Sequence, residues 1–175
     1  MNAPDTPPAG APPVLYLDLD GVLAPEHPPD EVPDTYPDFA VRWVGRRELA
    51  LSLIMVDELL ALPAEIVWVT TWVDFPEREL APALGMPGHR RWLDPTTPSP
   101  PPGGKLGAIL TDATGHGRPI AWIDDQEADQ RARRHLTRLE RPVLMLAPDP
   151  TTGLTPDDLT DLDDWLAATA ARRRR

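Results

Sequence analysis

Four short apolar runs restrict the fold of this chain more than any other feature of its sequence. The runs cover residues 14–19, 65–69, 120–123 and 142–147. An apolar run without alternating polar residues is typical of a strand that is buried on both faces, as in a parallel sheet. Longer stretches with helical periodicity separate the runs. This order predicts an α/β fold with a central parallel sheet.

The periodic stretches give the expected helices. Residues 47–62 carry apolar side chains at helical spacing, and Pro63 ends that segment. The C-terminal helix has Thr155 as a favourable N-cap, Pro156 at its first position and Asp158 in a capping-box-like arrangement. Further helices are expected at 76–84, from about 105 to 112 and at 126–139, a weak strand at 90–93, and an irregular excursion at 24–46.

Length and proline content indicate one domain with a tail at each end. The 175 residues suit a single domain, which we place at 13–170. We expect residues 1–12 to form a disordered N-terminal tail and residues 171–175 a basic C-terminal tail. The 24 prolines cluster in residues 3–13, 25–37 and 95–102. Stretches of this composition are typical of loops and linkers.

Composition excludes several classes of site and partner. Without cysteine, the chain cannot form disulfides, zinc–thiolate sites or a cysteine nucleophile. A net charge of −11 argues against a protein that coats nucleic acid, because phosphate backbones attract basic surfaces, although it does not exclude a nucleic-acid substrate. The N-terminus lacks the features of a signal peptide, and no segment approaches the roughly 18 apolar residues of a membrane span. We therefore expect a soluble, cytoplasmic protein that does not bind membranes.

Polar side chains follow three of the predicted strands at the point where each strand ends. In chain order they are Asp18 and Asp20, Thr70 and Thr71, and Asp124 and Asp125. The single lysine of the chain, Lys105, lies between the second and third of these strands, at a predicted helix start. Ligands of open α/β sheets bind beyond the carboxyl ends of the strands. We therefore expect these side chains to converge on one edge of the sheet.

The paired aspartates predict a magnesium site. In an extended chain Asp18 and Asp20 point the same way, and carboxylates that close repel each other unless a cation lies between them. Asp124 and Asp125 add further negative charge. Hard oxygen ligands with few basic neighbours are typical of Mg²⁺ sites. A single strand-terminal aspartate is more often a cap, but three such strand ends together favour a metal site.

Four segments, in order, resemble the motifs of the haloacid-dehalogenase (HAD) superfamily. VLYLDLDGVLAP is similar to the first motif, IVWVTT to the second and IAWIDD to the fourth, and Lys105 fits the third. The match covers residues 14–125, and the last strand and helix extend it to about residue 168. The resemblance implies a three-layer Rossmann-like fold. Because the intervals between motifs are short, we expect little or no cap domain, as in the small capless phosphatases of the superfamily.

The resemblance implies a phosphomonoester hydrolase with Mg²⁺ as its cofactor. Asp18 would be the nucleophile that forms an aspartyl-phosphate, and Asp20 the general acid that protonates the leaving oxygen. Asp18, the backbone carbonyl of Asp20 and Asp124 would hold the ion. Asp125 would either bind the metal through water or orient Lys105.

The same resemblance assigns the phosphate-binding side chains. Thr70 would donate a hydrogen bond to a phosphate oxygen, and Lys105 would place a compact positive charge on it. The simpler interpretations are that the Thr70 hydroxyl caps the following turn and that Lys105 is an ordinary surface residue. Thr71 takes the role of Thr70 if the strand ends one residue later.

Several alternatives remain for substrate and reaction. An open site suits a phosphorylated small molecule or a macromolecule, and the phosphatase parts of nucleic-acid repair enzymes are among the similar proteins. The proline loops 25–37 and 95–102 would then act as a partial lid. Within enzymes, the alternatives are a nucleic-acid-end phosphatase or another HAD reaction such as phosphotransfer. Outside them, the alternative is a catalytically silent HAD-like binding or regulatory module, against which the presence of Asp18 and Asp20 argues.

Overall fold

The computed structural model of the chain describes residues 11–26, 31, 34–44, 46–72, 80–86 and 91–173. Of the tail expected at 1–12, residues 1–10 lie outside these ranges. The carbonyls of Ala11 and Pro12 accept hydrogen bonds from Arg173 and Arg118. Within the described ranges, no helix has both the length and the apolar character needed to cross a membrane.

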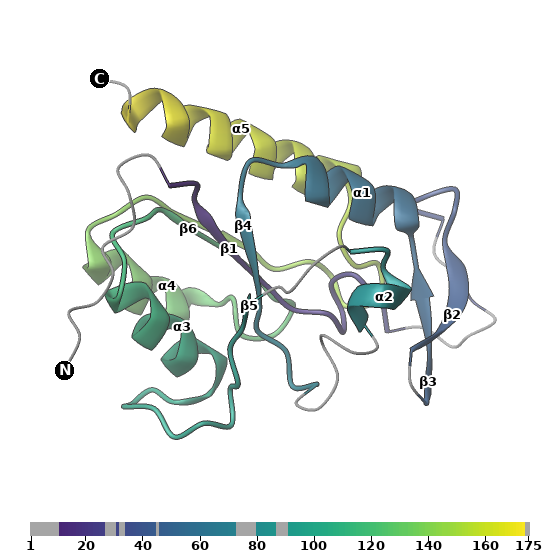
Figure 1. Cartoon of the computed structure of the whole chain (residues 1–175), viewed down its shortest axis with the longest axis horizontal. Helices are drawn as coiled ribbons and strands as arrows, with labels where there is room; N and C mark the ends of the chain where they lie inside the picture. The colour runs from purple at the N-terminus through teal and green to yellow at the C-terminus, as the bar shows by residue number, and fades with distance from the viewer. Residues whose placement is uncertain are drawn as a thin grey trace.

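Five parallel strands form the central sheet, in the order β5-β4-β1-β6-β7 (Figure 1). Their bounds are β1 (Val14–Leu17), β4 (Glu65–Trp68), β5 (Arg91–Trp92), β6 (Ile120–Ile123) and β7 (Val143–Leu146). The four predicted apolar runs and the weak strand at 90–93 are therefore confirmed, each within a few residues. Because β1 is the central strand, the residues that follow it are flanked by the ends of β4 and β6.

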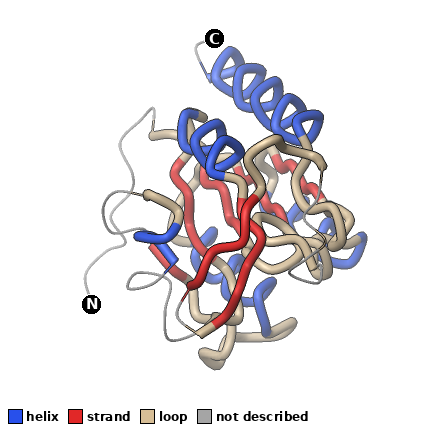
Figure 2. Tube along the Cα trace, turned by 90° about the vertical axis from the view of Figure 1, so that its right-hand side faces the viewer, coloured by secondary structure: helices blue, strands red, loops and turns tan. Residues whose placement is uncertain are grey.

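Helices cover both faces of the sheet and give three layers (Figures 1 and 2). One face carries α1 (Leu53–Ala61) and α5 (Pro156–Arg173), and the other carries α3 (Gly104–Thr114) and α4 (Gln130–Leu136). Alternate side chains of a strand point to opposite faces, so each strand contributes to two cores. Leu15 and Leu17 pack with the first pair of helices, whereas Val14 and Tyr16 pack with the second.

A β-hairpin replaces part of the helix predicted over 47–62. Strand β2 (Ala40–Val44) pairs antiparallel with β3 (Arg47–Leu51), at the end of the molecule opposite α4 (Figure 1). Residues 40–44 are therefore not irregular, and residues 47–51 are not helical. Leu49 and Leu51 are buried at a spacing of two, which satisfies a strand as well as a helix. Local spacing could not distinguish the two, and pairing with β2 decided it.

The remaining helices follow the prediction in part. Helix α5 is confirmed with its cap: Thr155 N–H donates to the Asp158 carboxylate, and Asp158 N–H donates back to the Thr155 hydroxyl. It continues to Arg173, beyond residue 170, where we expected the domain to end. Helix α4 begins at Gln130 rather than 126, and residues 137–139 form a 3-10 turn. Of the helix expected at 76–84, the described part contains only α2 (Ala81–Ala83).

Candidate active site

The register of the sheet brings the three polar strand ends together. Leu17 of β1 pairs with Trp68 of β4 on one side and with Ile123 of β6 on the other. Asp18 and Asp124 each follow directly after these paired residues, and the N–H of Asp18 donates to the carbonyl of Ile123 at 3.1 Å. The parallel pairing therefore places the side chains predicted for the site on one sheet edge.

Lys105 joins two of the aspartates. Its ammonium lies 2.5 Å from a carboxylate oxygen of Asp18 and 2.8 Å from one of Asp124. All three side chains are at least nine-tenths buried. Lys105 reaches this position from the first turn of α3, which begins after Gly103. It is not the ordinary surface residue that the simpler interpretation offered.

Asp124 is held by the turn that follows β6. Its other carboxylate oxygen accepts the backbone N–H groups of Gln126 and Glu127, at 3.0 and 2.6 Å. These bonds form a tight turn after the strand, and α4 begins only later, where Asp129 accepts from the N–H of Ala132 as its N-cap. The same bonds thus explain the late helix start and fix the orientation of Asp124.

Three carboxylates of this cluster can share one cation. Asp18, Asp124 and Asp125 each offer an oxygen, and the three oxygens lie within 4.8 Å of one another. One oxygen of Asp125 is buried without a hydrogen-bond partner among the described residues. Against three carboxylates there is one ammonium, which leaves a formal excess of two negative charges. A divalent cation with oxygen ligands fits both the charge and the unpaired oxygen.

Gly21 is required beside this cluster. Its φ is +68°, in the left-handed region that favours glycine. A Cβ at this position would lie 2.6 Å from the carboxylate of Asp125. The glycine of the first motif therefore lets the chain turn after β1 and leaves room for the acidic group of the fourth.

Burial raises the pKa of Asp18 to about 6, although the neighbouring Lys105 ammonium acts in the opposite direction. Burial and then the charge of Asp124 also raise the pKa of Asp125. For Lys105, burial opposes the charged form, but the two carboxylates prevail and its pKa lies above the usual value. Without a cation, the Lys105 ammonium therefore stays charged, and the carboxyl groups of Asp18 and Asp125 bind protons more readily than they would in water.

Asp20 lies at the rim of the site in a separate set of contacts. The indole N–H of Trp72 donates to its carboxylate at 2.8 Å, and Arg47 contacts the same oxygen at 3.4 Å. The Arg47 guanidinium also stacks over the Trp72 ring, 4.5 Å from its centroid. Asp20 is more exposed than Asp18, with 29% of its side chain accessible. It is absent from the three-aspartate cluster, so its side chain is not grouped with the metal ligands.

The two threonines that follow β4 differ in burial. Thr70 is buried and Thr71 is exposed. The Thr70 hydroxyl accepts a long hydrogen bond, 3.4 Å, from the N–H of Trp72. This is the turn-capping bond of the simpler interpretation, and it leaves the hydroxyl proton available as a donor.

The predicted lid loops are described only in part. Residues 27–30 and 32–33 of the loop 25–37 lie outside the described residues. The loop 95–102 lies beside α3 and bounds a cavity of about 370 Å³ with it. Trp92 and Leu93, at the end of β5, also line that cavity.

Two residues of the site were not assigned from the sequence. For Trp72, the available signal in the sequence is its position directly after Thr70-Thr71. Arg47 was assigned to a helix, and no local pattern connects it with Asp20. Only the hairpin brings it there, because β3 returns along the edge of the molecule next to the turn after β1.

One protein-family model matches most of the chain. The family is described as the HAD domain in Swiss Army Knife RNA repair proteins, and the match covers residues 14–159. Neither the curated proteins nor the solved structures gave a match. The matched segment begins at β1 and reaches into α5, so it contains every residue of the site described above.

Proposed function

The chain belongs to the family of HAD domains in Swiss Army Knife RNA repair proteins, and on this premise we propose that it is a Mg²⁺-dependent phosphomonoester hydrolase with Asp18 as its nucleophile. One observation carries the proposal: the buried cluster of Asp18, Asp124 and Asp125 around the Lys105 ammonium, with an unpaired oxygen on Asp125. A buried ion pair of this kind is costly as a purely structural device. In a phosphoryl-transfer site the same charged groups have a function, because that reaction depends on positioned charges that stabilise the transferred phosphoryl group.

Asp18 carries out the bond exchange in two steps. One of its carboxylate oxygens attacks phosphorus, and the bond between phosphorus and the leaving oxygen breaks, which leaves the phosphoryl group on Asp18. Water then attacks the same phosphorus, and the bond to Asp18 breaks. Inorganic phosphate is released and the carboxylate is restored.

Asp20 moves the protons of both steps. It donates a proton to the leaving oxygen in the first step and takes one from water in the second. Trp72 and Arg47 hold one of its oxygens, so the other is available to the reacting groups. Their role is positioning, since they act through Asp20.

Mg²⁺ fits the acidic cluster by charge and by ligand type. Asp18 and Asp124 would hold it, with the backbone carbonyl of Asp20, and Asp125 would complete the set directly or through water. The ion would neutralise the nucleophile and the phosphate so that these two anions can approach. Lys105 fixes the position of Asp18, and Thr70, or Thr71 as the exposed alternative, would donate to a phosphate oxygen.

A phosphatase screen tests this proposal. The substrates are phosphorylated metabolites, p-nitrophenyl phosphate and oligonucleotides with 3′- or 5′-phosphate, each with and without Mg²⁺. We expect hydrolysis that requires Mg²⁺ and falls at least about a thousandfold in Asp18→Asn, since a nucleophile is removed. Acid-quenched wild-type protein should carry phosphate on the peptide that contains Asp18. Activity that survives in Asp18→Asn would overturn the mechanism.

Nucleic-acid-end phosphatase is the second candidate, and the family description favours it. The matched family is described as the HAD domain in RNA repair proteins, and a phosphatase in such a protein would act on nucleic-acid ends. The screen distinguishes it from a metabolite phosphatase through the ratio of kcat/KM for oligonucleotides to that for small phosphomonoesters. No turnover of any substrate by folded, Mg²⁺-loaded protein would instead support the catalytically silent binding module.

A further inference from the structure

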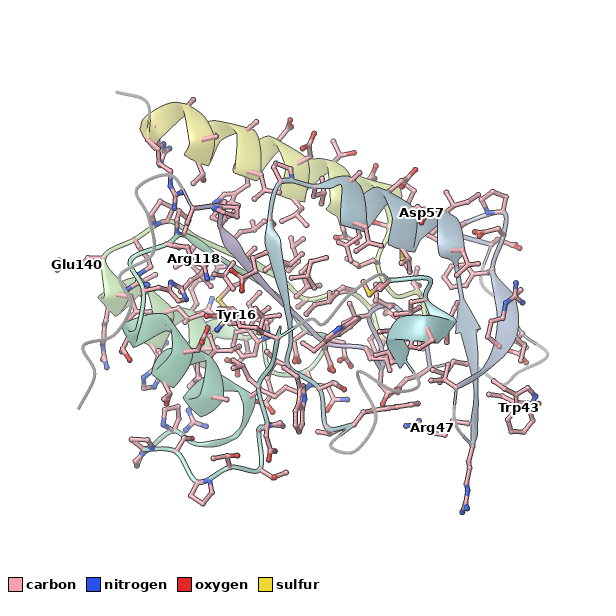
Figure 3. The ribbon with its side chains drawn as sticks, viewed as in Figure 1. Tyr16, Trp43, Arg47, Asp57, Arg118 and Glu140 are labelled. Atoms are coloured by element: carbon pink, nitrogen blue, oxygen red, sulfur yellow. The ribbon has the colours of Figure 1, made fainter. Side chains whose placement is uncertain are left out.

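The β2–β3 hairpin concentrates positive charge and an exposed aromatic ring. Arg42, Arg46 and Arg47 lie within six residues, in a chain whose net charge is −11. Trp43, between them, has 66% of its surface accessible, the larger of the two exposed large apolar side chains in the described part of the chain. Figure 3 shows Trp43 and Arg47 near the tip of the hairpin, at the same end of the molecule.

Part of the hairpin is anchored in the core, whereas Arg42, Trp43 and Arg46 are exposed. Val44, Leu49 and Leu51 are buried in the core that contains α1 and α5. Arg42 pairs with Leu49, and Trp43 pairs with Glu48 on the opposite face of the ribbon. The hairpin is thus packed against the core while its arginines and Trp43 remain exposed.

The hairpin is continuous with the candidate active site. Arg47 connects the two, because it contacts Asp20 and stacks on Trp72. Arg42 and Arg46 form no ion pair within the described ranges, whereas Arg91 and Arg118 pair with acidic side chains. Both side chains are exposed, and the Arg42 guanidinium donates to the carbonyl of Val41.

We propose that this hairpin binds the single-stranded segment of a nucleic acid whose terminal phosphate enters the site. This rests on the proposed phosphatase function and assigns the surface that would hold a nucleic-acid substrate. Arg42 and Arg46 contact backbone phosphates, and Trp43 stacks against an unpaired base, a combination found in single-strand binding surfaces. Glu48 beside Trp43 disfavours a phosphate at that point, so the base, not the backbone, lies over the indole ring.

The negative net charge of the chain favours a nucleic-acid path over its basic surfaces. Most of the surface of a protein with a net charge of −11 repels a polyanion. A nucleic-acid strand that reaches Asp18 therefore approaches over a surface with local positive charge. Another arginine-rich surface on the described part is α4, with Arg131, Arg133 and Arg134. Helix α4 lies at the opposite end of the molecule from the hairpin (Figure 1), and it supplies a matched control.

Binding is measured with a fluorescent single-stranded RNA oligonucleotide that carries a terminal phosphate. The Asp18→Asn background prevents turnover during the titration. In that background we compare Trp43→Ala, the double variant Arg42→Gln/Arg46→Gln, and the control Arg133→Gln/Arg134→Gln. We expect Trp43→Ala to weaken binding at least about fivefold. The hairpin double variant should reduce the slope of log K against log salt by about 1.4, and the α4 variant should change neither quantity.

Hydrolysis of p-nitrophenyl phosphate separates this proposal from the proposed function. In the otherwise wild-type protein, Trp43→Ala and Arg42→Gln/Arg46→Gln should leave kcat and KM for this substrate unchanged and raise KM for the phosphorylated oligonucleotide. Loss of binding in the α4 variant with intact binding in the hairpin variants would overturn the assignment of the hairpin. Failure of the wild-type protein to hydrolyse any phosphomonoester would overturn the catalytic proposal, while the binding titration would still test the hairpin.

Discussion

At the scale of single residues, the site depends on how much each carboxyl group is buried. The side chain of Asp18 is 5% exposed and lies 2.5 Å from an ammonium, whereas the side chain of Asp20 is 29% exposed and accepts an indole N–H. The two aspartates are separated by one residue, yet they have different partners and belong to different parts of the site. This division suits a nucleophile held in place and an acid that exchanges protons with substrate and water.

Binding of Mg²⁺ should depend on the protonation of Asp18. Burial raises the pKa of this carboxyl group from an ordinary value near 3.8 to about 6, so in the metal-free protein it is mostly protonated at pH 5 and mostly ionised at pH 7. Because the ion binds the carboxylate, we expect its affinity at pH 5 to be about tenfold weaker than at pH 7. Isothermal titration calorimetry measures this directly. Asp18→Asn should bind Mg²⁺ more weakly, and its affinity should not change between pH 5 and pH 7. Equal wild-type affinities at the two pH values would contradict the prediction.

The indole N–H of Trp72 should contribute to turnover through Asp20. In Trp72→Phe a ring remains beneath Arg47, but the hydrogen bond to Asp20 is lost. A hydrogen bond to a charged group contributes about 1.5–3 kcal/mol, so we expect kcat for p-nitrophenyl phosphate to fall roughly tenfold to a hundredfold, with a shifted acidic or basic limb of the pH profile. Trp43→Phe, at an exposed position, is the matched control. An unchanged kcat and pH profile in Trp72→Phe would remove Trp72 from the site.

At the scale of elements, one junction links the hairpin to the core. Ser52 directly follows β3 and caps α1: its hydroxyl accepts the N–H of Met55 and donates to Asp38 at 2.6 Å. Asp38 in turn accepts the N–H groups of Leu53 and Ile54. The junction therefore satisfies the first donors of the helix and fixes the direction in which the hairpin leaves it.

Ser52→Ala should destabilise the fold by about 1–3 kcal/mol. The substitution removes a helix N-cap and leaves a fully buried donor without its partner. Urea denaturation followed by circular dichroism measures the change. Thr160→Ala on the exposed face of α5 is the control, and we expect it to stay within about 0.5 kcal/mol of wild type. A Ser52 variant as stable as the control would show that the cap is dispensable.

At the scale of the whole molecule, the acidic charge collects where a cation can offset it. Three carboxylates of a chain with a net charge of −11 are brought within 4.8 Å, on the edge of a five-stranded parallel sheet. The described residues between β1 and α1 include the β2–β3 hairpin and contain no globular cap. The strand ends of the sheet thus hold the acidic cluster, and the basic β2–β3 hairpin lies beside it.

Mg²⁺ should therefore stabilise the entire fold. A ligand that binds only the native state at about 100 times its Kd adds about 2.7 kcal/mol, which for a chain of this size raises Tm by roughly 5–10 °C. Differential scanning fluorimetry with and without MgCl₂ measures the shift. Asp124→Asn should abolish it, and Asp161→Asn, an exposed acid on α5, should retain it. The same shift in both variants would indicate that the ion binds elsewhere.

The sequence by itself determined the sheet, the capped C-terminal helix and the residues that converge on one edge. These follow from local patterns: apolar runs without alternation, a Thr155–Asp158 cap, and polar residues directly after strands. The parallel register then places Asp18 beside Asp124 in any fold with this strand order.

Only the tertiary structure decided the hairpin and its contacts with Asp20. Leu49 and Leu51 fit a helix or a strand, and the choice rests on pairing with β2. Trp72 and Arg47 reach Asp20 across separations of 52 and 27 residues. Such contacts depend on the path of the chain between them, because side-chain spacing records only neighbours within a few residues.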